Sequence, residues 1–149
     1  MVQQNIDKII SNYLTKNIVF SEKNLLATKL SLLDTLGCIY NASTYEDPMR
    51  FATRGEYGSN TNPFLVINDM QYSKEITRYL SILTRWFDYN DTFLAKEWAH
   101  PSDNIGTVFG YFFKHKDKNL SQFFQSIIQM YEIQAVSYTH LRAHETDRH

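Results

Sequence analysis

The chain contains little cysteine, glycine or proline: its 149 residues include one, five and three of them, respectively. The single cysteine, Cys38, cannot form an internal disulfide, which fits a reducing compartment. It lies among apolar residues in LLDTLGCIY, whereas a nucleophilic cysteine needs an exposed, electropositive setting. We therefore expect a core thiol at Cys38. We expect no zinc site, because neither a second cysteine nor a recognised histidine spacing accompanies it.

Long apolar runs and an excess of one charge are also absent. No apolar stretch approaches the ~20 residues of a membrane-spanning helix. The N-terminus MVQQNIDKIISNYL lacks the pattern of a signal peptide. Fifteen Lys and Arg against sixteen Asp and Glu give a net charge of -1, with no basic run. These absences predict a cytoplasmic protein that binds neither a membrane nor nucleic acid.

Apolar and aromatic residues are abundant, at 43% and 15% of the chain, which is enough for one globular core. Apolar residues recur mostly at helical spacing, so we predict a mainly α fold: a partial helical bundle that can include a short β-hairpin. The hairpin is expected at Phe64–Tyr72, around the turn-forming pair Asn68–Asp69, and a loop is expected at Pro48–Asn62. The expected helices begin near Ile6, Ser21, Ser73, Asn104 and Ser121.

The last segment, AVSYTHLRAHETDRH, differs from the rest of the chain. The amphipathic pattern stops at Gln134, and three of the five histidines follow it. His140 and His144 have the i, i+4 spacing of helical metal ligands, but no third ligand is evident, so no metal site is predicted. The segment resembles translated vector sequence. We expect residues 1–134 to form one structural unit and residues 135–149 to be an unrelated, disordered tail.

The most unusual stretch is the polar connection WFDYNDTFLAKEWAHPSDN, residues 86–104, between two apolar segments. It does not match a calcium loop, because Phe93 stands where the turn glycine should be. Its groups suit acid–base chemistry on an anionic substrate. Histidine titrates near neutral pH, so His100 is a candidate for proton transfer, with Asp88 or Asp91 to orient it. Hydrogen bonds could come from Thr92, Asn90 and Asn104, and cations that hold carboxylates from Arg85 and Lys96.

A simpler interpretation of the same stretch is a polar connection between two helices. Such connections are usually hydrophilic, and HPSDN is a common kind of helix start in which Ser102 or Asp103 would be the cap. A histidine before proline is often only a loop residue. The pattern alone favours this structural interpretation.

The order of residues in this stretch resembles a known signature. The run RWFDYNDTFLAKEWAHPSDNIG, residues 85–106, is similar to that of the MmgE/PrpD family, and within it to the branch that dehydrates 2-methylcitrate. Three further segments occur in the family's order, namely LLDTLGCIYNA, VINDMQYSKE and YEIQ. The sequence departs from the family at Ala99, where a glycine is usual.

The resemblance implies a dehydratase without a metal or organic cofactor, which removes water from 2-methylcitrate to give 2-methyl-cis-aconitate in propionate catabolism. It implies catalytic roles for Asp88, Thr92 and His100. We expect the remaining polar candidates to bind the tricarboxylate: Arg85, Asn90, Asp91, Lys96 and Asn104. Family members are longer, and the full-length form is expected to be a homodimer. The chain would be only the N-terminal part of the family's helical domain, and we expect it to be inactive alone.

Two other interpretations stay open. The chain could be a non-catalytic helical fragment or interaction module that keeps the signature only as inherited packing. It could also belong to another MmgE/PrpD activity, such as a cis-aconitate decarboxylase, although the Glu97–Trp98 pair before His100 favours the dehydratase branch.

Overall fold

The computed structural model describes residues 6–16, 18–95 and 98–140. Within these residues the chain is mainly helical, which confirms the predicted fold class. The α-helices are α1 (Ile6–Leu14), α2 (Glu22–Ser43), α3 (Glu46–Thr53), α4 (Pro63–Val66), α5 (Ser73–Arg85), α6 (Ile105–Lys114) and α7 (Leu120–His140). Two 3-10 helices, η1 (Ile67–Asp69) and η2 (Pro101–Asn104), and a hairpin of β1 (Phe93–Leu94) and β2 (Trp98–Ala99) complete the structure.

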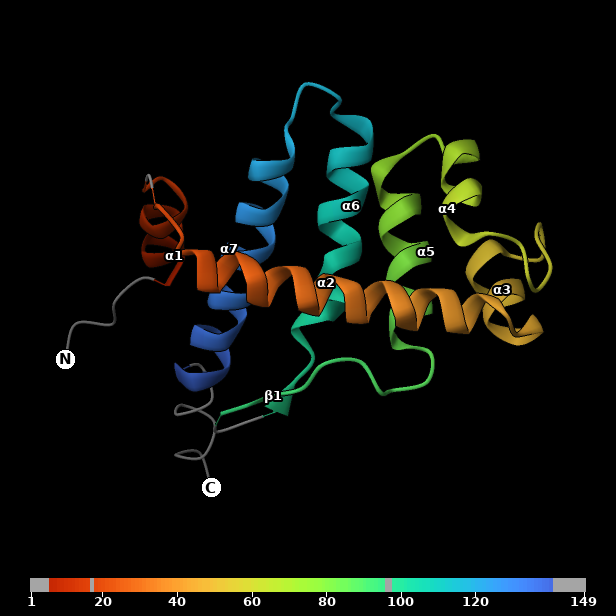
Figure 1. Cartoon of the computed structure of the whole chain (residues 1–149), viewed down its shortest axis with the longest axis horizontal. Helices are drawn as coiled ribbons and strands as arrows, with labels where there is room; N and C mark the ends of the chain where they lie inside the picture. Colours follow the sequence, from red (N-terminus) through yellow and green to blue (C-terminus); the bar gives the residue numbers. More distant parts are fainter. Residues whose placement is uncertain (1–5, 17, 96–97, 141–149) are drawn as a thin grey trace.

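The helices form a row that is crossed by one long helix. Figure 1 shows α5, α6 and α7 standing side by side, with α2 running across one face of them. α1 lies at the α7 end of the row, and α3 and α4 lie at the α5 end. The hairpin and η2 lie together at the end of the row where α5 finishes and α6 begins. The polar connection of residues 86–104 is therefore gathered at one end of the bundle.

The two longest helices begin at polar caps, at Ser21 as expected for α2 and at Asn119 rather than the expected Ser121 for α7. The Ser21 hydroxyl accepts the backbone N–H of Asn24 at 3.2 Å, and the Asn24 side chain accepts the N–H of Ser21 at 3.2 Å. At the start of α7, Asn119 and Gln122 make the same reciprocal pair, at 3.0 and 3.1 Å. Each pair satisfies backbone donors that have no partner inside a helix, and so fixes where the helix begins.

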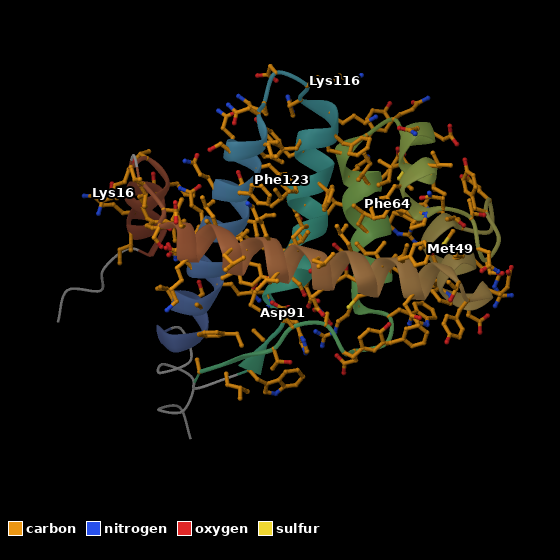
Figure 2. All side chains as sticks on the ribbon, in the orientation of Figure 1. Lys16, Met49, Phe64, Asp91, Lys116 and Phe123 are labelled. Atoms are coloured by element: carbon orange, nitrogen blue, oxygen red, sulfur yellow. The ribbon has the colours of Figure 1, made fainter. Side chains whose placement is uncertain are left out.

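The core lies where α2 crosses the row. The larger apolar cluster joins α2, α3, η1 and α5, and its buried members include Ile39, Met49, Ile67, Ile76, Tyr79, Leu80 and Leu83. A smaller cluster between α6 and α7 contains Val108, Phe123 and Ile127. Figure 2 labels one member of each, Met49 and Phe123. Cys38 is buried on α2, which confirms the predicted core thiol.

Two glycines of α6 allow it to lie against α5. A Cβ atom on Gly106 would come 2.6 Å from the Ser81 hydroxyl and 2.9 Å from the Thr77 carbonyl oxygen. On Gly110 it would come 2.6 Å from the Ser73 carbonyl oxygen. Distances this short leave no room for a side chain. Since η2 leads directly into α6, this contact also fixes η2 relative to the end of α5.

The outward side of α2 is apolar and uncovered by the described residues. Leu26, Leu30, Leu33 and Tyr40 are 59%, 59%, 66% and 60% exposed, and they recur at intervals of four, three and seven residues. Gly37 falls between them, and nothing lies within 4 Å of a Cβ built there. We refer to these five residues as the α2 stripe.

Two local predictions are wrong. Residues Phe64–Tyr72 do not form a hairpin but fold as α4 and η1, because Asn62 accepts the backbone N–H of Phe64 at 3.0 Å and Pro63 occupies the first helical position. The hairpin of the structure is β1 with β2, in which Leu94 pairs with Trp98. The expected loop at Pro48–Asn62 also contains most of α3, in which Pro48 sits in the first turn, where its missing N–H costs nothing.

The expected boundary at residues 134/135 does not coincide with a break in secondary structure. α7 passes through Gln134 and ends at His140. Positions 141–149, with His144 and His149, lie outside the described residues, so the unrelated tail stays a prediction. Among the residues that the structure covers, no helix is both long enough and apolar enough to cross a membrane.

Candidate active site

The polar connection leaves α5 through a sharp turn at Asp88. Its backbone adopts φ 58°, in the left-handed region, and its N–H is bonded to the carbonyl oxygen of Arg85 at 3.1 Å. Aspartate and asparagine tolerate this conformation better than most other residues. The turn ends the helix and directs the Asp88 side chain towards His100, which precedes η2.

His100 is held in one orientation. Its ring nitrogen Nδ1 lies 2.7 Å from the carbonyl oxygen of Asp91 and 3.2 Å from that of Asn90. Carbonyl oxygens only accept hydrogen bonds, so Nδ1 carries the hydrogen and Nε2 is the unprotonated nitrogen of the neutral ring. The side chain is 6% exposed, and the Trp98 ring meets it edge-on with centroids 5.2 Å apart.

The other nitrogen of His100 is free for chemistry. Nε2 is buried, makes no hydrogen bond among the described residues, and lies 3.6 Å from Oδ1 of Asp88. A proton gained by Nε2 would therefore lie beside a carboxylate. This is the arrangement expected of an acid–base histidine with an acidic partner.

Arg85 joins two carboxylates. Its Nη2 lies 2.9 Å from Oδ1 of Asp88, and its Nη1 lies 3.2 Å from Oδ2 of Asp103. The Oδ1 atom of Asp88 thus faces both Arg85 and His100. With both terminal nitrogens paired, Arg85 holds Asp88 in place.

Asn90 and Asp91 tie the connection to η2. The Asn90 amide, 3% exposed, donates to the Ser102 hydroxyl at 2.7 Å and to Oδ1 of Asp103 at 2.9 Å. The Asp91 carboxylate accepts the backbone N–H of Ser102 at 3.0 Å. These bonds hold the carbonyl groups of Asn90 and Asp91 against the His100 ring.

The remaining predicted site residues lie apart from this network. Thr92 is exposed and has no side-chain hydrogen bond to any described residue. Asn104 donates instead to Gln134 of α7 at 2.6 Å, in a groove of about 440 Å³ between α7 and Leu14 of α1. Lys96 lies outside the described residues. The structure therefore groups Arg85, Asp88, Asn90, Asp91 and His100.

Three participants were missed in the sequence. Asp103 and Ser102 are expected there only as helix caps, whereas the structure makes them partners of Arg85, Asn90 and Asp91. The third is Tyr131 of α7, whose hydroxyl is buried without a hydrogen bond of ordinary geometry among the described residues. Burial, followed by the nearby Asp91 carboxylate, raises the pKa of Tyr131. Its only sequence signal is its place in YEIQ.

No group of three or more His, Cys, Asp and Glu side chains within the described ranges is arranged to hold a metal ion. The site consists of a buried imidazole with a fixed tautomer, a carboxylate beside its free nitrogen, and hydrogen bonds that hold both. A site of this kind on a helical scaffold has the groups that acid–base chemistry requires.

Comparison with known proteins identifies the family. The family model described as the MmgE/PrpD N-terminal domain matches residues 9–149, so the chain belongs to the MmgE/PrpD family. The resemblance carried by residues 85–106 is thereby confirmed.

Three relatives have names that describe an activity. The chain is 32% identical over 110 residues to "Probable 2-methylcitrate dehydratase" of Saccharomyces cerevisiae, with 70% of this chain and 21% of the relative covered. It is 29% identical over 110 residues to "2-methylcitrate dehydratase, mitochondrial" of Yarrowia lipolytica, with the same coverage. It is 28% identical over 106 residues to "2-methylcitrate dehydratase" of Salmonella typhi, covering 69% and 21%. The chain thus spans about one fifth of their length. No solved structure matches it.

Proposed function

We propose that the chain is the N-terminal part of a hydro-lyase that removes water from 2-methylcitrate to give 2-methyl-cis-aconitate in propionate catabolism, and that His100 transfers the proton. The observation that carries the proposal is the buried Nε2 of His100, which accepts no hydrogen bond from any described residue and lies 3.6 Å from Asp88. The names of the relatives supply the substrate. The proposed reaction needs no metal or organic cofactor.

The reaction requires a base for a weakly acidic proton. The C–H bond of the methyl-bearing carbon breaks, its electron pair forms the carbon–carbon double bond, and the neighbouring hydroxyl departs with a proton as water. Unprotonated Nε2 of His100 can accept the first proton, and the resulting imidazolium is stabilised by Asp88. The same nitrogen, once protonated, can instead deliver a proton to the departing hydroxyl.

The pairing of polar groups narrows the proposed substrate contacts. Arg85 already pairs with Asp88 and Asp103 through its two terminal nitrogens, so we assign it to holding Asp88. The exposed hydroxyl of Thr92 remains available to the substrate, and Lys96 and Asn104 stay proposed ligands of its carboxylates and hydroxyl.

The proposal treats the active protein as longer than this chain. Because the chain spans about one fifth of its relatives, we propose that further substrate-binding groups come from other parts of a full-length enzyme, and that such an enzyme is a homodimer. A single wall of a site cannot hold a tricarboxylate in the geometry of proton transfer, so the chain alone should not turn over 2-methylcitrate. A cytoplasmic location remains a proposal, since one relative is named as mitochondrial.

The test uses a full-length enzyme that carries this segment. His100→Ala should lower kcat by ~10²-fold or more, as expected for the loss of acid–base help. His115→Ala is the matched control, because His115 is an exposed histidine whose ring is tilted against that of Tyr111, and it should keep the parent activity. Product formation is followed by the absorbance of the new double bond.

Two results would reject the proposal. Activity of His100→Ala within a few-fold of the parent would remove His100 from the mechanism. Turnover of 2-methylcitrate by the 149-residue chain alone would show that substrate-binding groups from the rest of a full-length enzyme are not required. Mass spectrometry of the product separates loss of water from loss of carbon dioxide, and so separates a dehydratase from a decarboxylase.

A further inference from the structure

Asp91 contributes two contacts that the proton-transfer scheme does not use. Its backbone carbonyl oxygen accepts the Nδ1–H of His100 at 2.7 Å. Its carboxylate oxygen Oδ1 accepts the backbone N–H of Ser102 at 3.0 Å. Asp91 therefore contacts the chain on both sides of Pro101, once through its backbone and once through its side chain.

The carboxylate of Asp91 is directed into the protein. Besides raising the pKa of Tyr131 on α7, it contributes, after burial and Asp34, to the raised pKa of the Cys38 thiol on α2. Because the Asp91 carboxylate raises the pKa of both Tyr131 on α7 and Cys38 on α2, it lies near both helices. Figure 2 shows Asp91 beside α2. It is poorly placed to bind a tricarboxylate, which its own charge would repel.

We propose that Asp91 is a positioning residue that fixes the tautomer of His100. By bonding to Ser102, its side chain holds its own carbonyl oxygen against Nδ1, and this leaves Nε2 as the nitrogen that exchanges protons. The inference rests on the proposed function of His100. Of the two roles expected for Asp91, it keeps the orientation of His100 and replaces the binding of substrate.

The side chain matters because Ser102 is fully buried. Without the Asp91 carboxylate, the N–H of Ser102 would have no acceptor among the described residues, and a buried donor without a partner favours a rearrangement of the chain. The carbonyl groups of Asn90 and Asp91 would then move away from Nδ1. A histidine without that constraint can carry its hydrogen on either nitrogen.

Three variants of the 149-residue chain separate geometry from charge. Asp91→Asn keeps the size of the side chain and an acceptor oxygen but removes the charge. Asp91→Glu keeps the charge but displaces the carboxylate by one methylene. Asp91→Ala removes both the acceptor oxygen and the charge. Asp47→Ala is the control, because Asp47 is an exposed carboxylate that pairs with Arg50. Nitrogen-15 NMR of the imidazole, at a pH where the ring is neutral, reports which ring nitrogen carries the hydrogen.

The parent, Asp91→Asn and Asp47→Ala should show the Nδ1–H form. Asp91→Glu and Asp91→Ala should shift His100 towards the Nε2–H form. If circular dichroism shows that Asp91→Ala does not fold, the comparison of Asp91→Asn with Asp91→Glu still tests whether the Asp91 side chain fixes the tautomer of His100. Retention of the Nδ1–H form by Asp91→Glu, or its loss in Asp91→Asn, would overturn the inference. These signals do not depend on turnover, so an active full-length His100→Ala enzyme would reject the proposed function while leaving the tautomer result intact.

Discussion

Oδ1 of Asp88 lies 3.6 Å from Nε2 of His100, slightly beyond hydrogen-bond distance. The carboxylate reaches this position only because Asp88 adopts φ 58° at the end of α5. Arg85 pairs with the same oxygen at 2.9 Å and so competes with His100 for it. Protonation of Nε2 would favour a shorter distance, because the imidazolium and the carboxylate attract each other.

Replacing Asp88 by Asn should separate activity from stability. Asparagine tolerates the positive φ but cannot stabilise an imidazolium by charge, so kcat of a full-length enzyme should fall about tenfold or more, equivalent to about 1.4 kcal/mol in the barrier. Since the Asp88 side chain is 63% exposed, the free energy of unfolding should change by no more than about 0.5 kcal/mol. Steady-state kinetics and urea denaturation measure the two quantities. An unchanged kcat would argue against a role for the Asp88 charge.

The contact between α5 and α6 predicts opposite effects for alanine at two helical glycines. Gly106→Ala should destabilise the chain by about 1–3 kcal/mol, because its methyl group would collide with Ser81 and the backbone of Thr77. Gly37→Ala is the matched control on α2, where a methyl group meets open space. It should stabilise the chain by about 0.5–1 kcal/mol through helix propensity. Thermal denaturation of both variants tests the prediction, which fails if Gly106→Ala is as stable as the parent.

Two largely buried tyrosines, Tyr79 and Tyr131, should contribute to a loss of stability at alkaline pH. Burial raises the pKa of Tyr79, and burial followed by the nearby Asp91 carboxylate raises that of Tyr131. In the unfolded chain both ionise near the ordinary tyrosine pKa of about 10, whereas the folded protein keeps their protons to a higher pH. Over that interval the native state binds more protons than the unfolded state. The free energy of unfolding should therefore fall as pH rises above about 10.

Tyr131→Phe tests which residue causes the alkaline loss. The hydroxyl of Tyr131 is buried and makes no well-formed hydrogen bond within the part of the chain that the structure describes, so its removal should cost little stability at neutral pH. The variant should lose less stability than the parent above a pH of about 10, because one raised pKa is removed. Urea denaturation across this range measures the difference. Equal slopes for parent and variant would show that Tyr131 does not contribute.

The α2 stripe should bind a hydrophobic dye. Leu26, Leu30, Leu33 and Tyr40 form a row of exposed apolar side chains, whereas Leu94 on β1 is 78% exposed but does not belong to the row. Leu33→Lys should lower dye fluorescence clearly, and Leu94→Lys should lower it less. Neither change should alter the unfolding free energy by more than about 0.5 kcal/mol, because both positions are exposed. Equal fluorescence of parent and Leu33→Lys would show that the stripe is not the dye site.

Much of the fold could be predicted because its helices carry local signals. Ser21 caps α2, and the spacing of Ile76, Tyr79, Leu80 and Leu83 gives α5 its buried side. The misplaced hairpin has a physical cause: FLVI suits a strand as well as a helix, and only the cap at Asn62 decides between them. The observed strands are two residues each, which is too short to produce an alternating pattern.

The site was only partly predictable, for a different reason. The crowding of polar groups indicates His100, Asp88 and their neighbours, but not which atoms meet. Those contacts depend on the positive φ of Asp88. They also depend on the position of η2 against α5, and this position is set by the close packing of Gly106 and Gly110 of α6 against α5. The proximity of Tyr131 to Asp91 depends on how α7 packs against α2, and sequence spacing carries no information about that.

The bond between the Asp91 carbonyl and His100 Nδ1 closes the base of the segment that carries the hairpin. Within this segment the Trp98 ring meets the imidazole edge-on, whereas positions 93–95 take no part in the contacts that hold His100. Closing a loop of twice the length costs only about 0.6 kcal/mol more, so insertions or deletions at positions 93–95 should be tolerated while His100 keeps its place. Homologous proteins are therefore free to differ in length between Thr92 and Lys96, and this interval is where sequence drift can alter the rim of the site without disturbing its chemistry.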